Sequence, residues 1–228
     1  MVHYSKLKLP FNLEAMKNEL SSFQEEWINH FNTYYYEGEW TVMPLRSPGG
    51  DSKNIIPELL MNKDYQDTLF MTHFVSVKEL LLSINCPVMA VRFLNLKAGA
   101  KIKEHKDNEL AFEKGEARLH FPVITNNEVE FYIEKERILL NEGECWYINA
   151  NLLHSVFNKG AADRIHLVID CKVNDWLSDM ITQSDNMLFK EHNEYDQLVK
   201  VIENLRLQNS SGANKVAMEL EQKLKRIK

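Results

Sequence analysis

Residues 104–110 read EHKDNEL, and in this polar stretch a single residue separates His105 from Asp107. Side chains two positions apart on an extended strand share a face, so this imidazole and carboxylate can point the same way. His154 follows after several predicted strands. Two histidines and a carboxylate can hold one face of an octahedral metal ion and leave the other face open. A solvated loop is the alternative. The similar triplet at 192–194 lies in a charged segment that we expect to be helical, and we interpret it as a solvated face.

A metal ion with one open face can bind two further molecules at the same time. This is the arrangement of non-haem iron(II) oxygenases, in which a chelating co-substrate and dioxygen must both reach the metal. Zinc more often takes a closed tetrahedral set or a three-ligand hydrolytic site. An arginine can hold the far carboxylate of such a chelator with two parallel charge-assisted hydrogen bonds. Arg164, ten residues after His154, and Arg118 are the candidates.

Two predicted strands each carry an arginine and a histidine on one side. In 118–122 (RLHFP), Arg118 and His120 alternate with apolar residues, and in 164–170 (RIHLVID) Arg164 and His166 do the same. Alternation places each pair on a common face. The face could line a functional site, or it could be the solvated side of an antiparallel sheet.

Short predicted strands broken by turns must position these residues. They cover 88–96, 97–107, 117–125, two runs within 128–140, 144–150, 154–158 and 164–173. Their number and close spacing predict an all-β sandwich or barrel. A strand is also expected at 40–45. Apolar periodicity predicts helices over 12–31 and 75–84, and two amphipathic helices beyond residue 190.

Composition narrows the class of protein. The chain has 228 residues, enough for one domain with an appendage, and 44% are hydrophobic, enough for a sizeable core. The net charge of −6 is mixed along the chain, without the basic stripe of a nucleic-acid-binding protein. Three cysteines, Cys86, Cys145 and Cys171, match no zinc motif, and we expect them to be reduced and buried. Without a signal-like or membrane-spanning run, a cytoplasmic location is expected, with no membrane partner.

The ordered motifs resemble a known family. They are His105-Lys106-Asp107, RLHFPVIT (118–125), GECWYIN (143–149), HSVFN (154–158) and RIHLVID (164–170), preceded by WTVMPLRSPGGD (40–51). Together, over roughly 27–176, they resemble the aspartyl/asparaginyl β-hydroxylases, a family of 2-oxoglutarate- and Fe(II)-dependent dioxygenases that includes bacterial prolyl hydroxylases. The resemblance implies a mainly β fold with flanking helices, whose core is a double-stranded β-helix, the jelly roll of cupins.

The resemblance also implies roles for individual residues. His105, Asp107 and His154 would bind iron, and Arg164 would bind the distal carboxylate of 2-oxoglutarate. Arg118 and His120 match positions that contact the co-substrate or the substrate beside it. The animal aspartyl β-hydroxylases lack the carboxylate ligand, so Asp107 makes this chain more similar to the bacterial amino-acid hydroxylases.

The implied activity is hydroxylation of an unactivated C–H bond in an amino acid, an amino-acid residue or a related small metabolite. It would consume dioxygen and 2-oxoglutarate and release succinate and carbon dioxide. The alternative is a cupin-like metal-binding or sensing protein without oxygenase activity. Arg164 and Arg118 argue against that alternative, because a bare metal site has no need of them.

Residues that would contact the substrate are harder to select. Arg46 could reach over the barrel mouth or lie on a surface turn, and Arg92 could face inward or outward. Trp146 could wall the pocket or belong to the core, and His166 could line the site or be a hydrogen-bonded core histidine. Asn149 and Asn158 flank His154 and could orient its ring.

The division of the chain is expected after residue 177. Residues 1–177 would form the dioxygenase domain with its N-terminal helices, and 178–228 a C-terminal helical extension. In the last helix, apolar residues recur at helical spacing: Val216, Leu220, Leu224 and Ile227. Such a stripe could pack on its own domain or form a homodimer.

Overall fold

The computed structural model describes residues 1–24, 27–56, 64–107, 110–184, 187–189, 194–208 and 210–227. The chain forms two compact units, one from Val2 to Leu188 and one containing the residues from Phe189 onward. The triplet at 192–194 falls largely outside the described residues. All three cysteines are buried and free, as expected.

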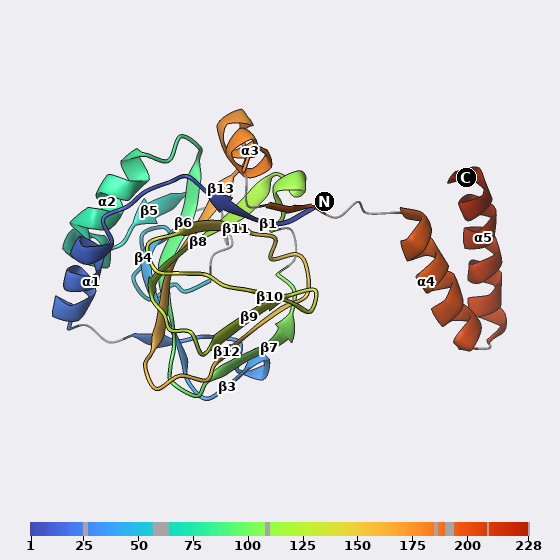
Figure 1. Ribbon diagram of the computed structural model, residues 1–228, viewed down its shortest axis with the longest axis horizontal. Coiled ribbons are helices and arrows are strands. Elements are labelled where there is room, and N and C mark those ends of the chain that lie inside the picture. Colours follow the sequence, from blue (N-terminus) through green and yellow to red (C-terminus); the bar gives the residue numbers. More distant parts are fainter. Residues whose placement is uncertain are drawn as a thin grey trace. The chain divides into compact units, whose positions relative to one another are not determined.

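Eight strands of the larger unit are divided equally between two antiparallel sheets (Figure 1). The larger sheet contains the neighbours β11 (Cys145–Ile148), β8 (Glu116–Ile124), β13 (Arg164–Lys172) and β6 (Val88–Leu96). The smaller sheet contains β10 (Glu136–Ile138), β9 (Val129–Ile133), β12 (His154–Asn158) and β7 (Lys101–His105). Because the chain crosses repeatedly between the sheets, the fold is the predicted double-stranded β-helix.

Further strands extend both sheets. Beyond β6, the larger sheet continues with β4 (Trp40–Pro48), which pairs with both β2 (Ile28–Asn29) and β5 (Tyr65–Asp67). Beyond β11, it continues with β1 (Val2–Leu7) and then β14 (Met187–Phe189). β3 (Tyr36–Glu37) pairs with β7 in the smaller sheet. Three 3₁₀ turns, η1 (Thr33–Tyr35), η2 (Leu69–His73) and η3 (Phe112–Lys114), connect these elements.

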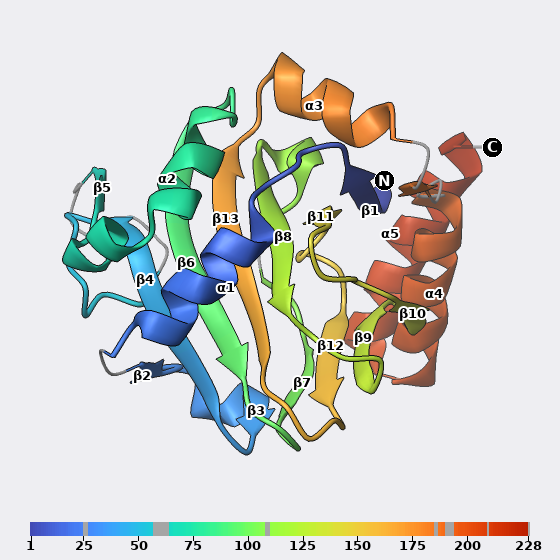
Figure 2. The ribbon, with the colours of Figure 1, turned by 60° about the vertical axis from the view of Figure 1, so that its left-hand side comes forward.

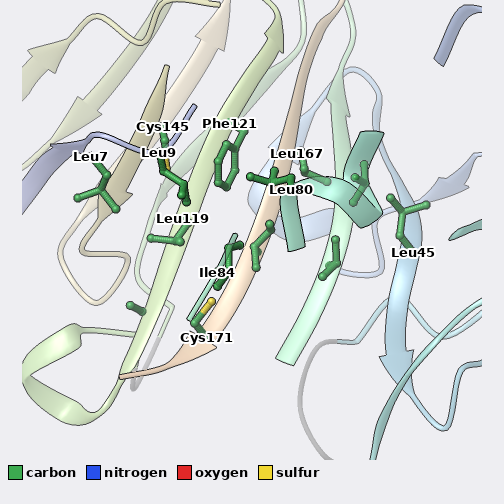
Figure 3. Close-up of a cluster of buried hydrophobic side chains, with 14 of the residues drawn as sticks. Leu7, Leu9, Leu45, Leu80, Ile84, Leu119, Phe121, Cys145, Leu167 and Cys171 are labelled. Atoms are coloured by element: carbon green, nitrogen blue, oxygen red, sulfur yellow. The ribbon is translucent and has the colours of Figure 1, made fainter. Parts of the chain in front are cut away.

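The main apolar core lies outside the barrel, between the larger sheet and three helices. These helices are α1 (Leu13–Ser22), α2 (Val75–Leu82) and α3 (Asp175–Thr182). Figure 2 shows α1 and α2 crossing one face of the sheet. Leu119, Phe121 and Leu167 alternate along β8 and β13 and point into this core (Figure 3). Since side chains alternate along a strand, the residues between them face the interior of the barrel.

The helix predicted over 12–31 is shorter than expected. α1 ends at Ser22, and Phe23 is extended with φ −78° and ψ 121°. Phe23 then packs against Phe70 and Phe74, with ring centroids 5.3 Å apart in both pairs. Ile28 pairs with Val42 in β4. Of the apolar residues that suggested one long helix, those up to Trp27 contact the main core, whereas Phe31 is 54% exposed.

The larger unit extends beyond the division expected after residue 177. Leu177 and Ile181 of α3 are fully buried in the main core, and Ser5 of β1 donates a hydrogen bond to the Ile181 carbonyl at 2.8 Å. The sequence pattern does not predict the strand β1, because six residues of mixed polarity at a chain end give a weak signal. α3 belongs with the barrel, and the smaller unit begins at Phe189.

The smaller unit contains α4 (Glu194–Leu207) and α5 (Ser211–Ile227), which pack on each other. Ala213 and Ala217 are buried, whereas Val216 is 44% exposed. Arg206 and Glu221 form an ion pair at 3.0 Å between the helices. Among the described residues, no helix combines the length and apolar character needed to cross a membrane. Dimerisation through these helices stays a prediction.

A truncation pair tests this division of the chain. A chain that ends at Leu188 should unfold at nearly the same temperature as the full chain, because it keeps α3. A chain that ends at residue 177 should melt lower, since burial of a side chain such as Ile181 is worth roughly 1.5–3 kcal/mol. Calorimetry compares the three chains.

Gel filtration of the same three chains tests the dimer. If the full chain elutes as a dimer and the chain ending at Leu188 as a monomer, α4 and α5 form the interface.

In the calorimetric test, equal melting temperatures of the two truncated chains would contradict the assignment of α3 to the barrel unit.

Candidate metal centre

His105 and His154 meet at one end of the smaller sheet. They end β7 and begin β12, and their Cα atoms are partners in the antiparallel register. Their ring centroids are 4.2 Å apart. The register shifts between His154 and Val156, a local bulge, and such bulges redirect side chains near functional sites. Strand pairing thus joins two histidines that are far apart in the sequence.

Asp107 completes the cluster from the loop after β7. Its backbone N–H donates to the Ala150 carbonyl at 2.8 Å, and its Oδ1 lies 3.7 Å from Nε2 of His105. One potential ligand atom from each of His105, Asp107 and His154 lies within 4.8 Å of the others. Two imidazole nitrogens and one carboxylate oxygen at this separation fit a divalent transition metal.

Backbone carbonyls orient both histidine rings. Nδ1 of His105 donates to the Lys103 carbonyl at 2.8 Å, and Nδ1 of His154 to the Leu152 carbonyl at 2.9 Å. These bonds favour the tautomer of each neutral ring in which the proton is on Nδ1 and Nε2 can bind a metal. Burial, helped by the neighbouring His105, lowers the pKa of His154 to about 4, so its ring is neutral near pH 7.

Asn149 and Asn158 do not have the orienting role considered for them. Asn149 donates to the Val2 carbonyl at 3.0 Å, and Asn158 to the carbonyls of Leu96 and Ala162 at 3.0 and 2.8 Å. Both asparagines therefore fasten backbone segments together beside the site. A hydrogen bond from a ring to a carbonyl two residues earlier depends on the local backbone and carries no sequence signal.

A chain of alternating charges lies against the cluster of His105, Asp107 and His154. Asp170 accepts from Nε and Nη2 of Arg118 at 2.7 and 3.2 Å, and from Nη1 of Arg92 at 2.9 Å. Nη1 of Arg118 also donates to Oδ2 of Asp107. Arg92 therefore faces inward. Asp107 holds Arg118 with one oxygen and keeps the other toward His105.

The buried charges stabilise one another. Burial alone would raise the pKa of Asp170, but Arg118 and Arg92 hold it well below its usual range. Burial likewise disfavours the charge on Arg118, yet Asp170 and Asp107 raise its pKa above the ordinary value. Sequence reasoning missed Asp170, although it lies on the same face of its strand as Arg164 and His166, and this spacing could have identified it.

A cavity of about 710 Å³ opens at the candidate metal ligands His105 and Asp107. His105, Asp107, Arg92, Arg118 and Asp170 form its polar side. Much of the remaining wall is aromatic or aliphatic and includes His30, Phe31, Tyr35, Trp40, Ile55, Met89 and Leu94.

Aromatic stacking builds part of this wall. Tyr35 stacks on the ring of His105 with centroids 5.3 Å apart, and His30 stacks on Trp40 at 3.6 Å. Burial, followed by the charge of Arg92, lowers the pKa of His30 to about 4. No sequence pattern indicates a role for His30, since it has no partner at a fixed spacing.

Arg164 and His120 lie deeper in the barrel. The Arg164 guanidinium sits 5.7 Å from the Phe131 ring centroid, and Phe131 is stacked on His154 at 6.5 Å. Nε of Arg164 and Nδ1 of His120 are buried without a hydrogen-bond partner among the described residues. Burial lowers the pKa of Arg164 to about 9, and no carboxylate offsets it. A buried cation without an anion fits the distal carboxylate of 2-oxoglutarate.

Two of the residues considered for substrate binding lie elsewhere. Arg46 forms an ion pair with Asp67 at 2.7 Å, at the edge where β4 meets β5. Trp146 is buried and donates to Glu144 at 2.8 Å. Neither lines the cavity at the candidate metal ligands. His166 is buried beside Arg164.

Comparison with known proteins finds one family. Residues 11–173 match the family model described as aspartyl/asparaginyl beta-hydroxylase. The chain is 24% identical over 139 residues to L-proline cis-3-hydroxylase 2 of a Streptomyces species, covering 60% of this chain and 48% of that protein. The chain thus spans about half the length of this curated relative.

Solved structures show weaker likeness. A 2OG-Fe(II) oxygenase family oxidoreductase from Burkholderia pseudomallei aligns with a TM-score of 0.49 and 12% identity, covering 71% of this chain and 79% of that one. A viral collagen prolyl hydroxylase from Paramecium bursaria Chlorella virus-1 aligns with a TM-score of 0.42 and 12% identity, covering 75% and 97%.

Substitution of Asp170 tests the charge chain. Asp170→Asn should destabilise the fold by about 3 kcal/mol, because breaking a buried ion pair leaves charge uncompensated. It should also weaken cobalt(II) binding about tenfold or more, because Arg118 would no longer hold Asp107 in place. Denaturant unfolding and metal titration measure the two effects.

The matched control is Asp67→Asn, which removes an ion pair whose carboxylate side chain is 46% exposed. It should cost less than about 1 kcal/mol and leave metal binding unchanged. If the two variants behaved alike, Asp170 would have no special place in the site.

The difference in folding stability between wild type and Asp170→Asn should depend on pH. A carboxylate whose pKa is lowered by folding contributes stability above its unfolded pKa, about 3.9, and loses it as pH falls toward the folded value. The stability difference between wild type and Asp170→Asn should therefore be constant from pH 7 to about pH 5 and shrink below about pH 4. A difference that shrank already between pH 7 and 5 would contradict the low pKa of Asp170.

Proposed function

The chain belongs to the aspartyl/asparaginyl β-hydroxylase family, and from that premise we propose that it is a 2-oxoglutarate- and Fe(II)-dependent dioxygenase. It would hydroxylate an unactivated C–H bond of an amino acid, an amino-acid residue or a related small metabolite. One observation carries the proposal: the cluster of His105, Asp107 and His154 shares a barrel with Arg164, a buried cation that has no carboxylate partner among the described residues.

His105, Asp107 and His154 would hold the iron through two Nε2 atoms and one carboxylate oxygen. Bound together, iron and 2-oxoglutarate would activate dioxygen and release succinate and carbon dioxide. The backbone carbonyls of Lys103 and Leu152 keep both rings ready to bind. Arg118 occupies the other oxygen of Asp107, which favours a single-oxygen ligand and leaves more of the metal open.

Arg164 would bind the distal carboxylate of 2-oxoglutarate, with its charge buried at 2% exposure. His120 lies nearby, its ring 6.0 Å from that of Phe131. It is neutral, because burial and the charges of Arg164 and Arg118 hold its pKa well below 6.5. We propose that it contacts the co-substrate as a neutral hydrogen-bonding group. Arg118 is already matched by two carboxylates, so we assign it to Asp107.

The substrate would enter the cavity at the candidate metal ligands. Its volume of about 710 Å³ lies within the range of small-molecule sites, roughly 300–1,000 Å³. The aromatic wall of His30, Tyr35 and Trp40 can exclude water and contact apolar parts of a ligand. Arg92, tied to Asp170 at one nitrogen, retains donors at the polar side.

Co-substrate binding tests the proposal. Anaerobic addition of iron(II) and then 2-oxoglutarate should produce the weak visible charge-transfer band of the chelate. His105→Ala should abolish the band, and Arg164→Ala should weaken 2-oxoglutarate binding by a factor of about ten or more, since a hydrogen bond to a charged group is worth roughly 1.5–3 kcal/mol. Screening of amino acids for succinate release would follow.

His73→Ala is the control, because His73 is an exposed histidine of η2 and should leave the band unchanged. Metal binding without any affinity for 2-oxoglutarate would favour the alternative, a cupin-like metal-binding or sensing protein. In that case Arg164 would have only a structural role.

A further inference from the structure

Two of the three cysteines lie together where β13 ends and β6 begins. Cys171 belongs to β13, and Cys86 comes two residues before the first residue of β6. Both side chains belong to the main apolar core, in which Cys171 is fully buried and Cys86 is 9% exposed. The site inside the barrel uses neither cysteine, because this core lies outside the barrel.

Hydrogen bonds on both sides of Cys86 fasten its segment to the end of β13. The Lys172 N–H group donates to the Pro87 carbonyl at 2.9 Å, and Nδ2 of Asn174 donates to the Asn85 carbonyl at 2.8 Å. Lys172 and Pro87 are exposed. Since side chains alternate along paired strands, the cysteine that precedes each of them points the other way, into the core. The two cysteines are therefore diagonal neighbours on one face.

The two thiols contact each other, and they are not equivalent. The Cys171 S–H group donates a hydrogen bond to the sulfur of Cys86, and this lowers the pKa of the Cys86 thiol. The same hydrogen bond, together with burial, raises the pKa of Cys171 well above its usual value. Cys86 also lies between two exposed residues, Asn85 and Pro87, so it is the nearer of the two to solvent. A thiol with a lowered pKa beside a second thiol is typical of oxidation-sensitive cysteine pairs.

Cys171 is also the neighbour of Asp170, the carboxylate that holds Arg118 by two hydrogen bonds. The pairing of β13 with β6 shifts register between Ile169 and Cys171, so Asp170 lies in an irregular part of the ladder. A bulge of this kind sets the direction of the side chain within it. A change in the position of Cys171 therefore alters the direction of Asp170, and through Arg118 it reaches Asp107.

We propose that Cys86 and Cys171 are a modification site, which a peroxide oxidises to a disulfide that weakens metal binding by His105, Asp107 and His154. Closing the bond brings the end of β13 and the segment before β6 closer together than a contact between thiols does. The carboxylate next to the bond moves with it, which loosens the ion pairs that support the metal ligands. Reduction of the disulfide reverses both effects. The switch requires neither substrate nor 2-oxoglutarate.

The oxidation balances with hydrogen peroxide as the oxidant. The Cys86 sulfur attacks one peroxide oxygen, so that an S–O bond forms, the O–O bond breaks and one water leaves with the thiol proton. The Cys171 sulfur then attacks the sulfur of the Cys86 sulfenic acid, so that the S–S bond forms and the S–O bond breaks. The hydroxide that leaves takes the Cys171 proton and becomes a second water. Two thiols lose two electrons, and the peroxide accepts them.

Peptide mapping of the metal-free full chain tests for the disulfide. One equivalent of hydrogen peroxide is added, the remaining thiols are blocked in denaturant, and the non-reduced peptides are analysed by mass spectrometry. One disulfide should join Cys86 to Cys171, and Cys145 should keep a free thiol. The proposal is wrong if the folded protein does not react, if the bond involves Cys145 or joins two chains, or if Cys86 becomes a sulfinic acid without a cross-link.

Cobalt(II) titration measures the consequence for the metal ligands. Peroxide is removed by desalting before cobalt is added, so that the metal cannot promote oxidation of its own ligands. Oxidised wild type should bind cobalt about tenfold or more weakly than the reduced protein, as expected when the groups that support metal ligands are displaced. A thiol reductant should restore binding. Unchanged cobalt binding by protein that carries the disulfide, or a loss that the reductant does not reverse, would contradict the proposed effect on the metal ligands.

Three cysteine variants provide the controls. Cys86→Ala and Cys171→Ala cannot form the disulfide, so peroxide should leave their cobalt binding unchanged. Cys86→Ala, at the less buried position, keeps the test available if Cys171→Ala folds poorly. Cys145→Ala removes a similarly buried thiol of β11 and should respond to peroxide as wild type does. An equal response of all three variants would mean that peroxide acts elsewhere on the protein, and the proposal would be overturned.

Asp170→Asn separates a path through this carboxylate from a general distortion of β13. The variant should form the disulfide as wild type does. Oxidation should then add little to its existing loss of cobalt affinity, because two changes that act through one group are not additive. A further loss of about tenfold in this variant would overturn the path through Asp170.

Discussion

The carboxylate of Asp170, held between the guanidinium groups of Arg92 and Arg118, is the interaction on which the site depends. Three buried charges would be prohibitively costly alone, and they are tolerated only because each is hydrogen-bonded to an opposite charge. Arg118 extends the chain of charges to Asp107. The position of a candidate metal ligand is therefore coupled to β13 and β6, on the opposite sheet from the two histidines. Electrostatic matching, rather than apolar packing, joins the two sheets at this end of the barrel.

This arrangement requires the two faces of the larger sheet to have opposite character. The outer face supplies Leu119, Phe121 and Leu167 to the core under the helices. The inner face carries Asp170, Arg118 and Arg92 at one end and His166 and Arg164 at the other. Because the apolar core is built outside the barrel, the barrel interior does not have to supply the main hydrophobic stabilisation. The interior can then hold polar groups whose hydrogen bonds are completed by ligands.

Some charged side chains on the inner face of the larger sheet have an oppositely charged partner among the described residues, and others do not. Arg92 and Arg118 have carboxylate partners, whereas Arg164 has only a neutral imidazole among the described residues. Arg92 and Arg118 therefore stabilise the site through ion pairs within the protein, whereas Arg164 is suited to bind an anionic ligand. This difference also bears on Arg118, which the resemblance alone placed against the co-substrate or the substrate beside it. Its contacts place it between a metal-ligand candidate and a structural carboxylate.

The sequence by itself determined that the core is an all-β sandwich or barrel, and the resemblance of its motifs to a known family indicated the double-stranded β-helix. It also identified His105, Asp107 and His154 as a cluster, because alternation along strands is local and the spacing of motifs is visible in one dimension. It also placed Arg118 with His120, and Arg164 with His166, on shared faces. Only the tertiary structure decided which charges are paired, since Asp170 meets Arg92 and Arg118 through strand pairing between distant segments. Packing likewise decided the aromatic wall, the strand β1 and the early end of α1. It also left Nε2 of His166 without a hydrogen-bond partner among the described residues. These features depend on neighbours brought together by the fold, and no periodicity along the chain records them.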